Sequence, residues 1–356
     1  MLPQPEPEPR LIFAVPGSIA TRTGGSIYDR RVSAALRDRG WNVDIVECSG
    51  DFPAPGETDL LALDRVLGSC PDRALVMIDG LIFGAIPGMA ARHAARLRLV
   101  ALVHHPLALE TGLGIEAIAR YRDAEQRALR CAAGVITTSQ PTAAILIRDY
   151  AVAPGCITIA PPGTDRPAHR GRDPAQPTIA LLAVGAVIPR KGYDVLVEAL
   201  RPLADLDFAC LIIGNTERCP ATVAALRAAI RAGGLDHRIT LAGEVDDVDR
   251  AYANADIFVL PSRYEGYGMA FGEALAHGLP IVATLAGAIP SVVPADAGHL
   301  VPVDDPIALA DALRGLIIEP EHRARLAAGS RRAARDLPDW TDTARLIGEA
   351  LRKLPD

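Results

Sequence analysis

Hydrophobic positions along this chain fall into short runs separated by longer segments with helical spacing of apolar and polar residues. The runs are rich in Leu, Ile and Val and end at Gly, Pro or Asp, which is typical of strands buried on both faces of a sheet. Their alternation with amphipathic helices from end to end predicts parallel βαβ units. The predicted strands are Leu11–Val15, Val43–Glu47, Leu75–Ile78, Leu99–Val103, Val135–Thr138, Thr178–Val184, Phe208–Ile213, Ile239–Ala242, Ile257–Leu260 and Ile281–Ala283.

Domain boundaries follow from the same pattern and from the length of 356 residues, which exceeds what a single core usually supports. Residues 161–177 are dense in Pro, Gly and charge and predict an exposed linker, placed at 166–177. We expect an α/β protein of two Rossmann-like, doubly wound parallel-sheet domains facing a cleft. They cover 1–165 and 178–335, and a C-terminal helix over 336–356 could pack back on the first domain.

Composition narrows the function classes. Hydrophobic residues make up 49% and charged residues 22%, which indicates well-buried cores. The net charge of −6 argues against nucleic acid and anionic lipid as general partners. The six cysteines show no CxxC pair or zinc spacing. With no apolar run near the roughly 20 residues of a membrane span and no signal peptide, we expect a cytoplasmic protein.

The segment Pro261–Pro280, PSRYEGYGMAFGEALAHGLP, follows a predicted strand and opens a helix near Gly268. Free amides at a helix N-terminus favour a diphosphate, and Gly266 would let the backbone approach it closely. Glu265 and Glu273 stand eight positions apart and could accept hydrogen bonds from hydroxyl groups at either end of such a ligand. Alone, each acid could equally be an ordinary solvated residue.

Two further loops carry polar residues at strand ends. In VGAVIPRKGY, Arg190 and Lys191 follow a strand, where two cations suit a leaving diphosphate. In PGSIATRTGGSIY, the amides of Gly24 and Gly25 could meet phosphates, with Ser26 capping the helix that follows. Each signal is weak by itself.

The E-x7-E segment resembles the signature of family 4 of the retaining glycosyltransferases, which have the GT-B fold. The resemblance implies that Glu265 faces the donor sugar and that Glu273 binds the nucleotide ribose. It also implies that Arg190 and Lys191 bind the donor phosphates in place of a metal. Many members carry an Arg directly after the strand-ending glycine, where this chain has Ala186, so Arg190 would supply the guanidinium from the other end of the loop.

The same resemblance implies that His104, which ends LVALVH, contacts the donor sugar, with His105 as the alternative. Without the resemblance, either residue could be a structural histidine. Main-chain groups just past the strand at Gly243 would hold the base. The predicted catalytic residues are Glu265, His104, Arg190 and Lys191; the donor-binding residues are Gly24, Gly25, Gly243, Glu244, Gly266, Tyr267, Gly268, Met269 and Glu273; the acceptor-side residues are His105 and Glu110.

These residues predict a retaining hexosyltransferase that moves a hexose from a UDP- or GDP-sugar to an acceptor hydroxyl. No metal or other cofactor is expected, since Asp246–Asp247 is interpreted as a helix cap. The alternatives are a sugar-nucleotide 2-epimerase and a catalytically silent nucleotide-sugar-binding module. The acceptor could be a small molecule, a glycan or a lipid, and we expect residues 106–130 to recognise it. Acids there, Glu125 among them, interrupt the arginines and favour a solvated helix, so a peripheral membrane contact is not indicated.

Overall fold

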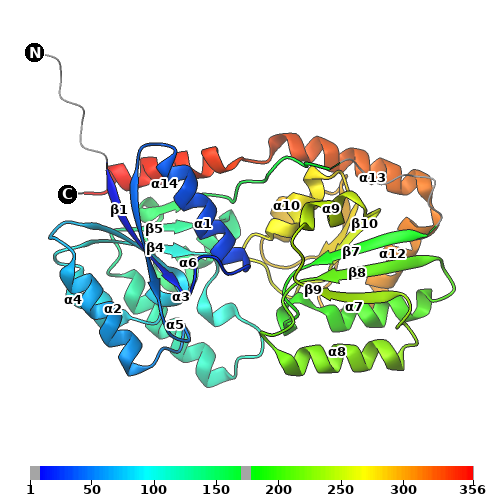
Figure 1. The fold of residues 1–356 in the computed structure, drawn as a ribbon, viewed down its shortest axis with the longest axis horizontal. Helices are drawn as coiled ribbons and strands as arrows, with labels where there is room; N and C mark the ends of the chain where they lie inside the picture. The colour runs from blue at the N-terminus through cyan, green and yellow to red at the C-terminus, as the bar shows by residue number, and fades with distance from the viewer. Residues whose placement is uncertain (1–8, 170–177, 356) are drawn as a thin grey trace, which may run out of the picture. The chain divides into compact units, whose positions relative to one another are not determined.

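The structure is a computed structural model that describes residues 9–169 and 178–355 (Figure 1). It divides into two compact units: unit 1 is Met1–Gly163 with Pro338–Asp356, and unit 2 is Thr164–Leu337. The chain thus enters unit 2 within the Pro-rich stretch and returns to unit 1 for its last helix. Of the predicted linker, residues 170–177 lie outside the described residues.

Unit 1 contains a parallel sheet whose described strands run in the order β2-β1-β3-β4-β5-β6. The first connection runs to one side of β1 and all later ones to the other, so the switch point lies between β1 and β3. The strands are β1 Arg10–Pro16, β2 Asn42–Cys48, β3 Leu75–Asp79, β4 Arg98–Val103, β5 Gly134–Thr137 and β6 Ile157–Ile159. The helices are α1 Gly24–Arg37, α2 Glu57–Ser69, α3 Gly80–Phe83, α4 Pro87–His93, α5 Ile115–Leu129, α6 Gln140–Tyr150 and α14 Trp340–Lys353.

Unit 2 contains a second parallel sheet, in the order β12-β11-β10-β7-β8-β9, with its switch point between β7 and β10. The strands are β7 Ile179–Val184, β8 Phe208–Ile213, β9 Ile239–Gly243, β10 Ile257–Leu260, β11 Ile281–Thr284 and β12 Gly298–Val301. The helices are α7 Tyr193–Leu200, α8 Pro220–Ala232, α9 Val248–Ala253, α10 Met269–Ala276, α11 Ile289–Val292, α12 Pro306–Ile318 and α13 Pro320–Ala333.

Each strand predicted from the sequence is present, with ends that agree within one residue. Two short edge strands, β6 and β12, were not predicted. β6 has only three residues, none of them fully buried, so its apolar run is too short to stand out. Edge strands of this kind form because a neighbouring strand offers unpaired backbone groups, which the local sequence does not show.

The C-terminal helix predicted over 336–356 is α14, which begins later than predicted, at Trp340. α13 ends at Ala333, and α14 begins at Trp340 after Asp339, whose carboxylate accepts from the backbone N–H of Asp342. α14 then packs on α1: the Trp340 ring meets the Tyr28 ring edge-on at 5.8 Å between centroids. None of the described helices is long and apolar enough to cross a membrane.

The cores of the units are apolar and closely packed. Leu11, Phe13 and Met77 in unit 1, like Ile257, Phe258 and Val282 in unit 2, are fully buried. Among the described glycines, Gly329 on α13 has the closest neighbour, because a Cβ there would lie 1.7 Å from the carbonyl oxygen of Asp296, just before β12.

We expect Gly329→Ala to lower the free energy of unfolding by about 1–3 kcal/mol, since backbone atoms must move to admit the methyl group. The matched control is Gly315→Ala on α12, where the nearest neighbour of an added Cβ is 3.9 Å away. That variant should gain about 0.5–1 kcal/mol from helix propensity. Urea denaturation measures both; equal effects of the two substitutions would contradict the packing described.

Candidate functional site

The switch point of unit 2 brings two distant loops to one place. β7 and β10 are neighbours in the sheet, and parallel strands end on the same edge. The loop after β7 carries Arg190 and Lys191, and the loop after β10 carries Glu265. The sheet therefore gathers these three predicted residues although 74 positions separate Lys191 from Glu265.

Glu265 is the centre of this cluster and is only 5% exposed. Its Oε1 lies 2.7 Å from Lys191 Nζ and accepts from the Ser262 hydroxyl at 2.6 Å. Its Oε2 lies 3.3 Å from an amino nitrogen of Arg190, which also donates to the carbonyl oxygen of Tyr264. Arg190 thus reaches the cluster despite starting from the far end of its loop.

The charges in this cluster fix the ionisation of its carboxyl group. Burial alone would raise the pKa of Glu265, but the charges of Lys191 and Arg190 and the hydrogen bonds to it prevail and lower the pKa to about 2. With Glu265 ionised, two cations face one anion, which leaves a net charge of +1. A buried site with an excess positive charge is suited to an anionic ligand.

Backbone geometry at α10 agrees with the predicted helix start. Gly268 precedes the helix with φ +91°, a conformation that L side chains rarely adopt. Gly287 approaches the same loop from the other side, and a Cβ there would lie 2.2 Å from the carbonyl oxygen of Glu265. Both glycines allow the Glu265 loop to pack tightly against the sheet edge.

Glu273, the second acid of the E-x7-E segment, lies on α10. Burial raises the pKa of its carboxyl group, which the hydroxyl of Tyr252 contacts with an opposing effect. The Tyr252 ring stacks on His277 at 5.3 Å, and His277 Nε2 lies 2.9 Å from Asp249. Glu273 is thus held by a row of side chains from α9 and α10.

The other donor-side residues predicted in unit 2 lie at the end of β9 and in the loop after β10. Gly243 ends β9 and accepts at its carbonyl oxygen from the Gly214 N–H, while Glu244 accepts from the Asn215 amide at 3.0 Å. Gly266 is buried, Tyr267 packs against the core of unit 2, and Met269 is the first residue of α10. Asp247 caps α9, as predicted, by accepting from the Arg250 N–H.

Arg263, which the sequence analysis did not single out, holds the loop that carries Arg190 and Lys191, here called the cationic loop, by its backbone. Its backbone N–H donates to the carbonyl oxygen of Arg190 at 2.8 Å, and its guanidinium donates to that of Pro189 at 2.5 Å. The guanidinium also meets both carboxylate oxygens of Asp194, at 3.0 and 2.7 Å, and one of Asp304 at 2.7 Å. This fork ties the loop after β7 to the loop after β10.

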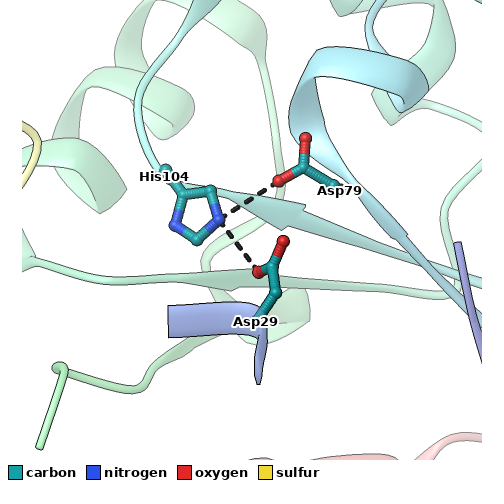
Figure 2. Close-up of side chains that lie close together, drawn as sticks. All are labelled: Asp29, Asp79 and His104. Carbon is teal, nitrogen blue, oxygen red and sulfur yellow. Dashed lines mark hydrogen bonds and ion pairs between the residues drawn. The ribbon is translucent and has the colours of Figure 1, made fainter. Parts of the chain in front are cut away.

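Unit 1 has its own cluster at its own switch point. His104 follows β4, Asp79 ends the neighbouring strand β3, and Asp29 lies on α1, the helix after β1. His104 Nε2 lies 3.1 Å from Asp79 Oδ2 and 3.2 Å from Asp29 Oδ1, as Figure 2 shows. Both acids are 1% exposed. The predicted His104 therefore has two buried carboxylate partners that the sequence analysis missed.

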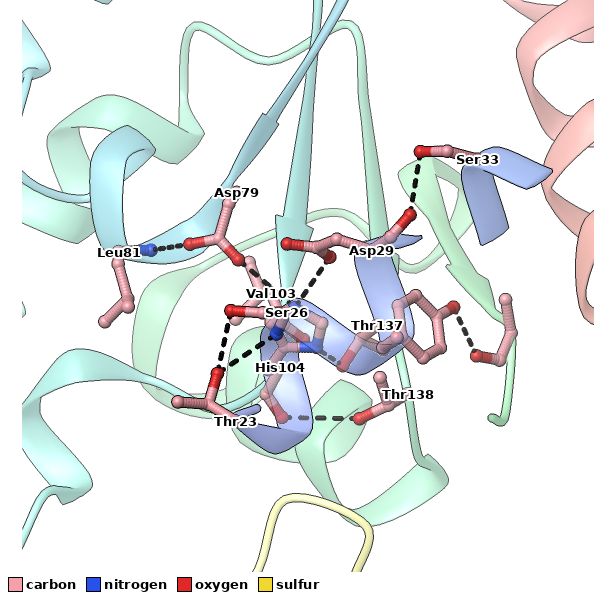
Figure 3. A network of polar contacts seen from close by, with 12 residues as sticks. Thr23, Ser26, Asp29, Ser33, Asp79, Leu81, Val103, His104, Thr137 and Thr138 are labelled. Atoms are coloured by element: carbon pink, nitrogen blue, oxygen red, sulfur yellow. Dashed lines mark hydrogen bonds and ion pairs between the residues drawn. The ribbon is translucent and has the colours of Figure 1, made fainter. Parts of the chain in front are cut away.

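Backbone contacts fix this cluster further (Figure 3). Asp79 Oδ1 accepts from the Leu81 N–H at 2.8 Å, and the Thr138 hydroxyl donates to the carbonyl oxygen of His104 at 3.3 Å. The predicted cap at Ser26 is wrong: Thr23 precedes α1, and its hydroxyl oxygen accepts from the Ser26 N–H at 3.2 Å. The cap comes earlier because the helix begins at Gly24.

Gly24 and Gly25 therefore form the first turn of α1 instead of a loop before it. Gly25 lies beside His104, since a Cβ there would be 3.5 Å from Nε2. Of the acceptor-side pair, His105 Nε2 and Glu110 Oε2 lie 3.6 Å apart. The structure thus brings each predicted residue of the first unit to the ends of β1 and β4.

Glu125 corrects the expectation of a solvated helix within 106–130. It is 1% exposed, and it accepts from the Leu107 N–H at 3.0 Å in the loop that carries His105 and Glu110. Helical spacing alone could not show this, because the face of α5 that meets the loop depends on the tertiary packing. Burial raises the pKa of Glu125 to about 8, against hydrogen bonds from Leu107 and Tyr150.

Some of the missed residues had a sequence signal. Asp79 follows LVMI directly, as His104 follows LVALV, and an acid at the end of a buried parallel strand is a candidate by the same rule that selected His104. Asp29 had no sequence signal beyond its place four residues after Gly25, because its partner, His104, lies 75 positions away.

Two groups of described residues have metal-ligand types within 4.8 Å of one another: Asp29, Asp79 and His104, and His169, Asp247 and Asp249. In the first, Nε2 of the histidine already meets both acids. In the second, His169 Nδ1 is 2.6 Å from Asp249, which leaves no room for an ion between these two atoms.

Two doubly wound parallel sheets with charged clusters at their switch points define a protein of the GT-B class. Anabaena Alr3699/HepE, solved with UDP-glucose, has the same fold: the TM-score is 0.77 at 18% identity, over 97% of this chain and 100% of that one. Residues 74–166 match the family described as Glycosyltransferase Family 4, and residues 178–319 match Glycosyl transferases group 1.

Comparison with curated relatives shows the family to which the chain belongs. A D-inositol 3-phosphate glycosyltransferase of Arthrobacter sp. (strain FB24) is 30% identical over 294 residues, 76% of this chain and 69% of the relative. One of the same name from Xylanimonas cellulosilytica is 31% identical over 238 residues, 62% of this chain and 57% of that relative's length. The chain belongs to glycosyltransferase family 4.

The buried carboxyl group of Glu125 predicts a pH-dependent stability. Its pKa is raised from 4.5 to about 8 on folding, so the folded state keeps a proton that the unfolded state loses. Stability from this group is therefore full below about pH 4.5 and falls as the pH rises towards 8. Glu125→Gln should remove this loss and gain roughly 4 kcal/mol relative to the wild type between pH 5 and pH 9.

Denaturant unfolding at pH 5, 7 and 9 measures this difference. Glu116→Gln is the matched control, because Glu116 is exposed on the same helix. A constant difference between Glu125→Gln and wild type across this range would show that Glu125 does not carry the buried proton.

Proposed function

We propose that the chain is a retaining, metal-independent hexosyltransferase that uses a UDP- or GDP-sugar. The observation that carries this proposal is the buried cluster of Arg190, Lys191 and Glu265 in unit 2. Its net charge of +1 stands at the end of the switch-point strands, where a doubly wound sheet binds its ligand. The UDP-glucose bound in the Anabaena structure supports a nucleotide sugar as the donor.

In the proposed reaction the acceptor oxygen bonds to the anomeric carbon as the bond from that carbon to the diphosphate oxygen breaks. The acceptor proton passes to a phosphate oxygen of the leaving group, on the face from which the diphosphate departs, so the configuration is retained. Lys191 and Arg190 compensate the negative charge that develops on the diphosphate, which is the role a metal would otherwise fill. Glu265 holds both cations in place and accepts from a sugar hydroxyl.

Glu273 is proposed to accept from the ribose hydroxyls, with main-chain groups at Gly243 and Glu244 holding the base. His105 and Glu110 are proposed for the acceptor side. The relatives named D-inositol 3-phosphate glycosyltransferase make a phosphorylated cyclitol the first polar acceptor to test.

Calorimetric titration with UDP-glucose, GDP-mannose and the free nucleotides tests the donor. We expect one nucleotide series to bind equally well in EDTA and in magnesium, because Arg190 and Lys191 supply the charge. Glu273→Gln should weaken that binding about tenfold or more, since a carboxylate acceptor is lost. Binding that needs magnesium would contradict metal independence, and no binding of either series would contradict the donor class. Conversion of donor alone to an epimer would favour the epimerase alternative.

Arg263 should matter to donor binding through the loop it holds. Arg263→Lys keeps the charge but cannot bond Pro189, Asp194 and Asp304 together, so the Arg190–Lys191 loop should loosen. We expect donor affinity to fall about tenfold in the same titration, with little change in the midpoint of thermal unfolding.

The matched control for this variant is Arg314→Lys. Arg314 also donates from its guanidinium to a backbone carbonyl, that of Pro202, in the same unit. It should leave donor affinity unchanged. An equal loss of affinity in both variants would mean that the loss reflects general stability.

A further inference from the structure

His104 is held by two acids through a single nitrogen. Figure 2 shows both carboxylates meeting Nε2, while Nδ1 lies on the side of the ring away from them. The side chain of His104 is 20% exposed, whereas those of Asp29 and Asp79 are 2% exposed. The acids are therefore inside the fold, and the ring is the more exposed member of the cluster, with Nδ1 turned away from the acids.

Two effects disfavour a positive charge on the His104 ring. Burial disfavours it, and so does the positive end of α1, whose Gly25 lies beside Nε2. Two carboxylates at 3.1 and 3.2 Å act the other way, and each can be buried only if a cation or a proton compensates it. The acids prevail: despite burial, hydrogen bonds and charge from Asp29 and Asp79 raise the pKa of His104 to about 10.

We propose that Asp29 and Asp79 are positioning residues that keep His104 as an imidazolium, so that Nδ1–H is a charged hydrogen-bond donor to an oxygen of the nucleotide-sugar substrate. A neutral ring bonded at Nε2–H would instead present Nδ1 as an acceptor. His104 is thus excluded as a general base and stabilises negative or hydroxyl oxygen. The substrate part of this proposal rests on the proposed function; the locked charge does not.

Other titratable groups that face the cluster stay fixed around neutral pH. Burial raises the pKa of Tyr28 well above its usual value, and its hydroxyl donates to the carbonyl oxygen of Ala160. Burial and the charge of Asp79 raise the pKa of Cys48 to about 11. Burial raises the pKa of Asp29 to about 6, against the opposing effect of His104. Between pH 7 and 9 a change at His104 can therefore be assigned to His104 itself.

Nitrogen NMR of ¹⁵N-histidine-labelled protein without donor tests the locked charge, with His104→Gln identifying the signal. We expect both nitrogens of His104 to be protonated at pH 8. Asp29→Asn and Asp79→Asn should each lower its titration midpoint by at least ~1 pH unit, and together by more. The amide oxygen that Asp79→Asn introduces can still accept from the Leu81 N–H, so that variant should fold. Asp64→Asn, which alters the His93–Asp64 pair of the same unit, should leave His104 unchanged.

A neutral His104 at pH 7 in the wild type, or unchanged midpoints in both Asn variants, would overturn the proposal. So would a signal that changes with EDTA, because a metal would then hold the three groups together. Addition of UDP-glucose or GDP-mannose should shift Nδ1. If calorimetry shows binding and Nδ1 does not respond, the assignment of Nδ1 to the substrate is wrong; if neither donor binds, the proposed function fails while the locked charge stands.

Activity gives a second readout that a structural role would not move. The kcat of the Asp79→Asn variant should fall about tenfold or more as the pH rises through the lowered His104 midpoint that NMR gives for that variant, with a smaller change in KM, while the wild type keeps its kcat over the same range. Below that midpoint much of this loss should be absent, because the ring keeps its proton. A loss of kcat that is equal on both sides of the midpoint would mean that Asp79 acts on structure alone.

Discussion

Parallel pairing of the strands is the constraint on which the rest of this protein depends. Every strand of a parallel sheet ends on the same edge, and at a switch point the two central connections leave in opposite directions. In unit 2 this places the loops after β7 and β10 together, and in unit 1 it places the ends of β1, β3 and β4 together. Charged residues from distant parts of the chain meet at each edge for this reason alone.

The two units bury charge in opposite senses. Unit 2 holds one carboxylate, Glu265, between two cations, and unit 1 holds one imidazole, His104, between two carboxylates. In each case the single central group is fixed by partners that cannot be left uncompensated inside the fold. A preformed charge of this kind needs no rearrangement when a substrate arrives.

Two residues outside the charged clusters hold the loops that carry the sites. Arg263 joins the cationic loop to the Glu265 loop through its guanidinium, and Glu125 holds the backbone at Leu107 from within α5. Neither is required to touch a substrate. Their buried or partly buried polar contacts restrict the loops to one geometry, because loss of a partner would leave a buried group without its hydrogen bond.

The sequence by itself indicated ten of the twelve described strands and the class of fold, because buried runs are local patterns, and its E-x7-E spacing selected Glu265 and Glu273 as candidates. It did not reveal β6, β12, the start of the last helix at Trp340, the cap at Thr23 or the burial of Glu125, each of which depends on what packs alongside. The acid partners of His104 were beyond it for the same reason. Asp29 and Asp79 reach one imidazole nitrogen only through the order of the strands, and that order is decided by the packing of the whole sheet.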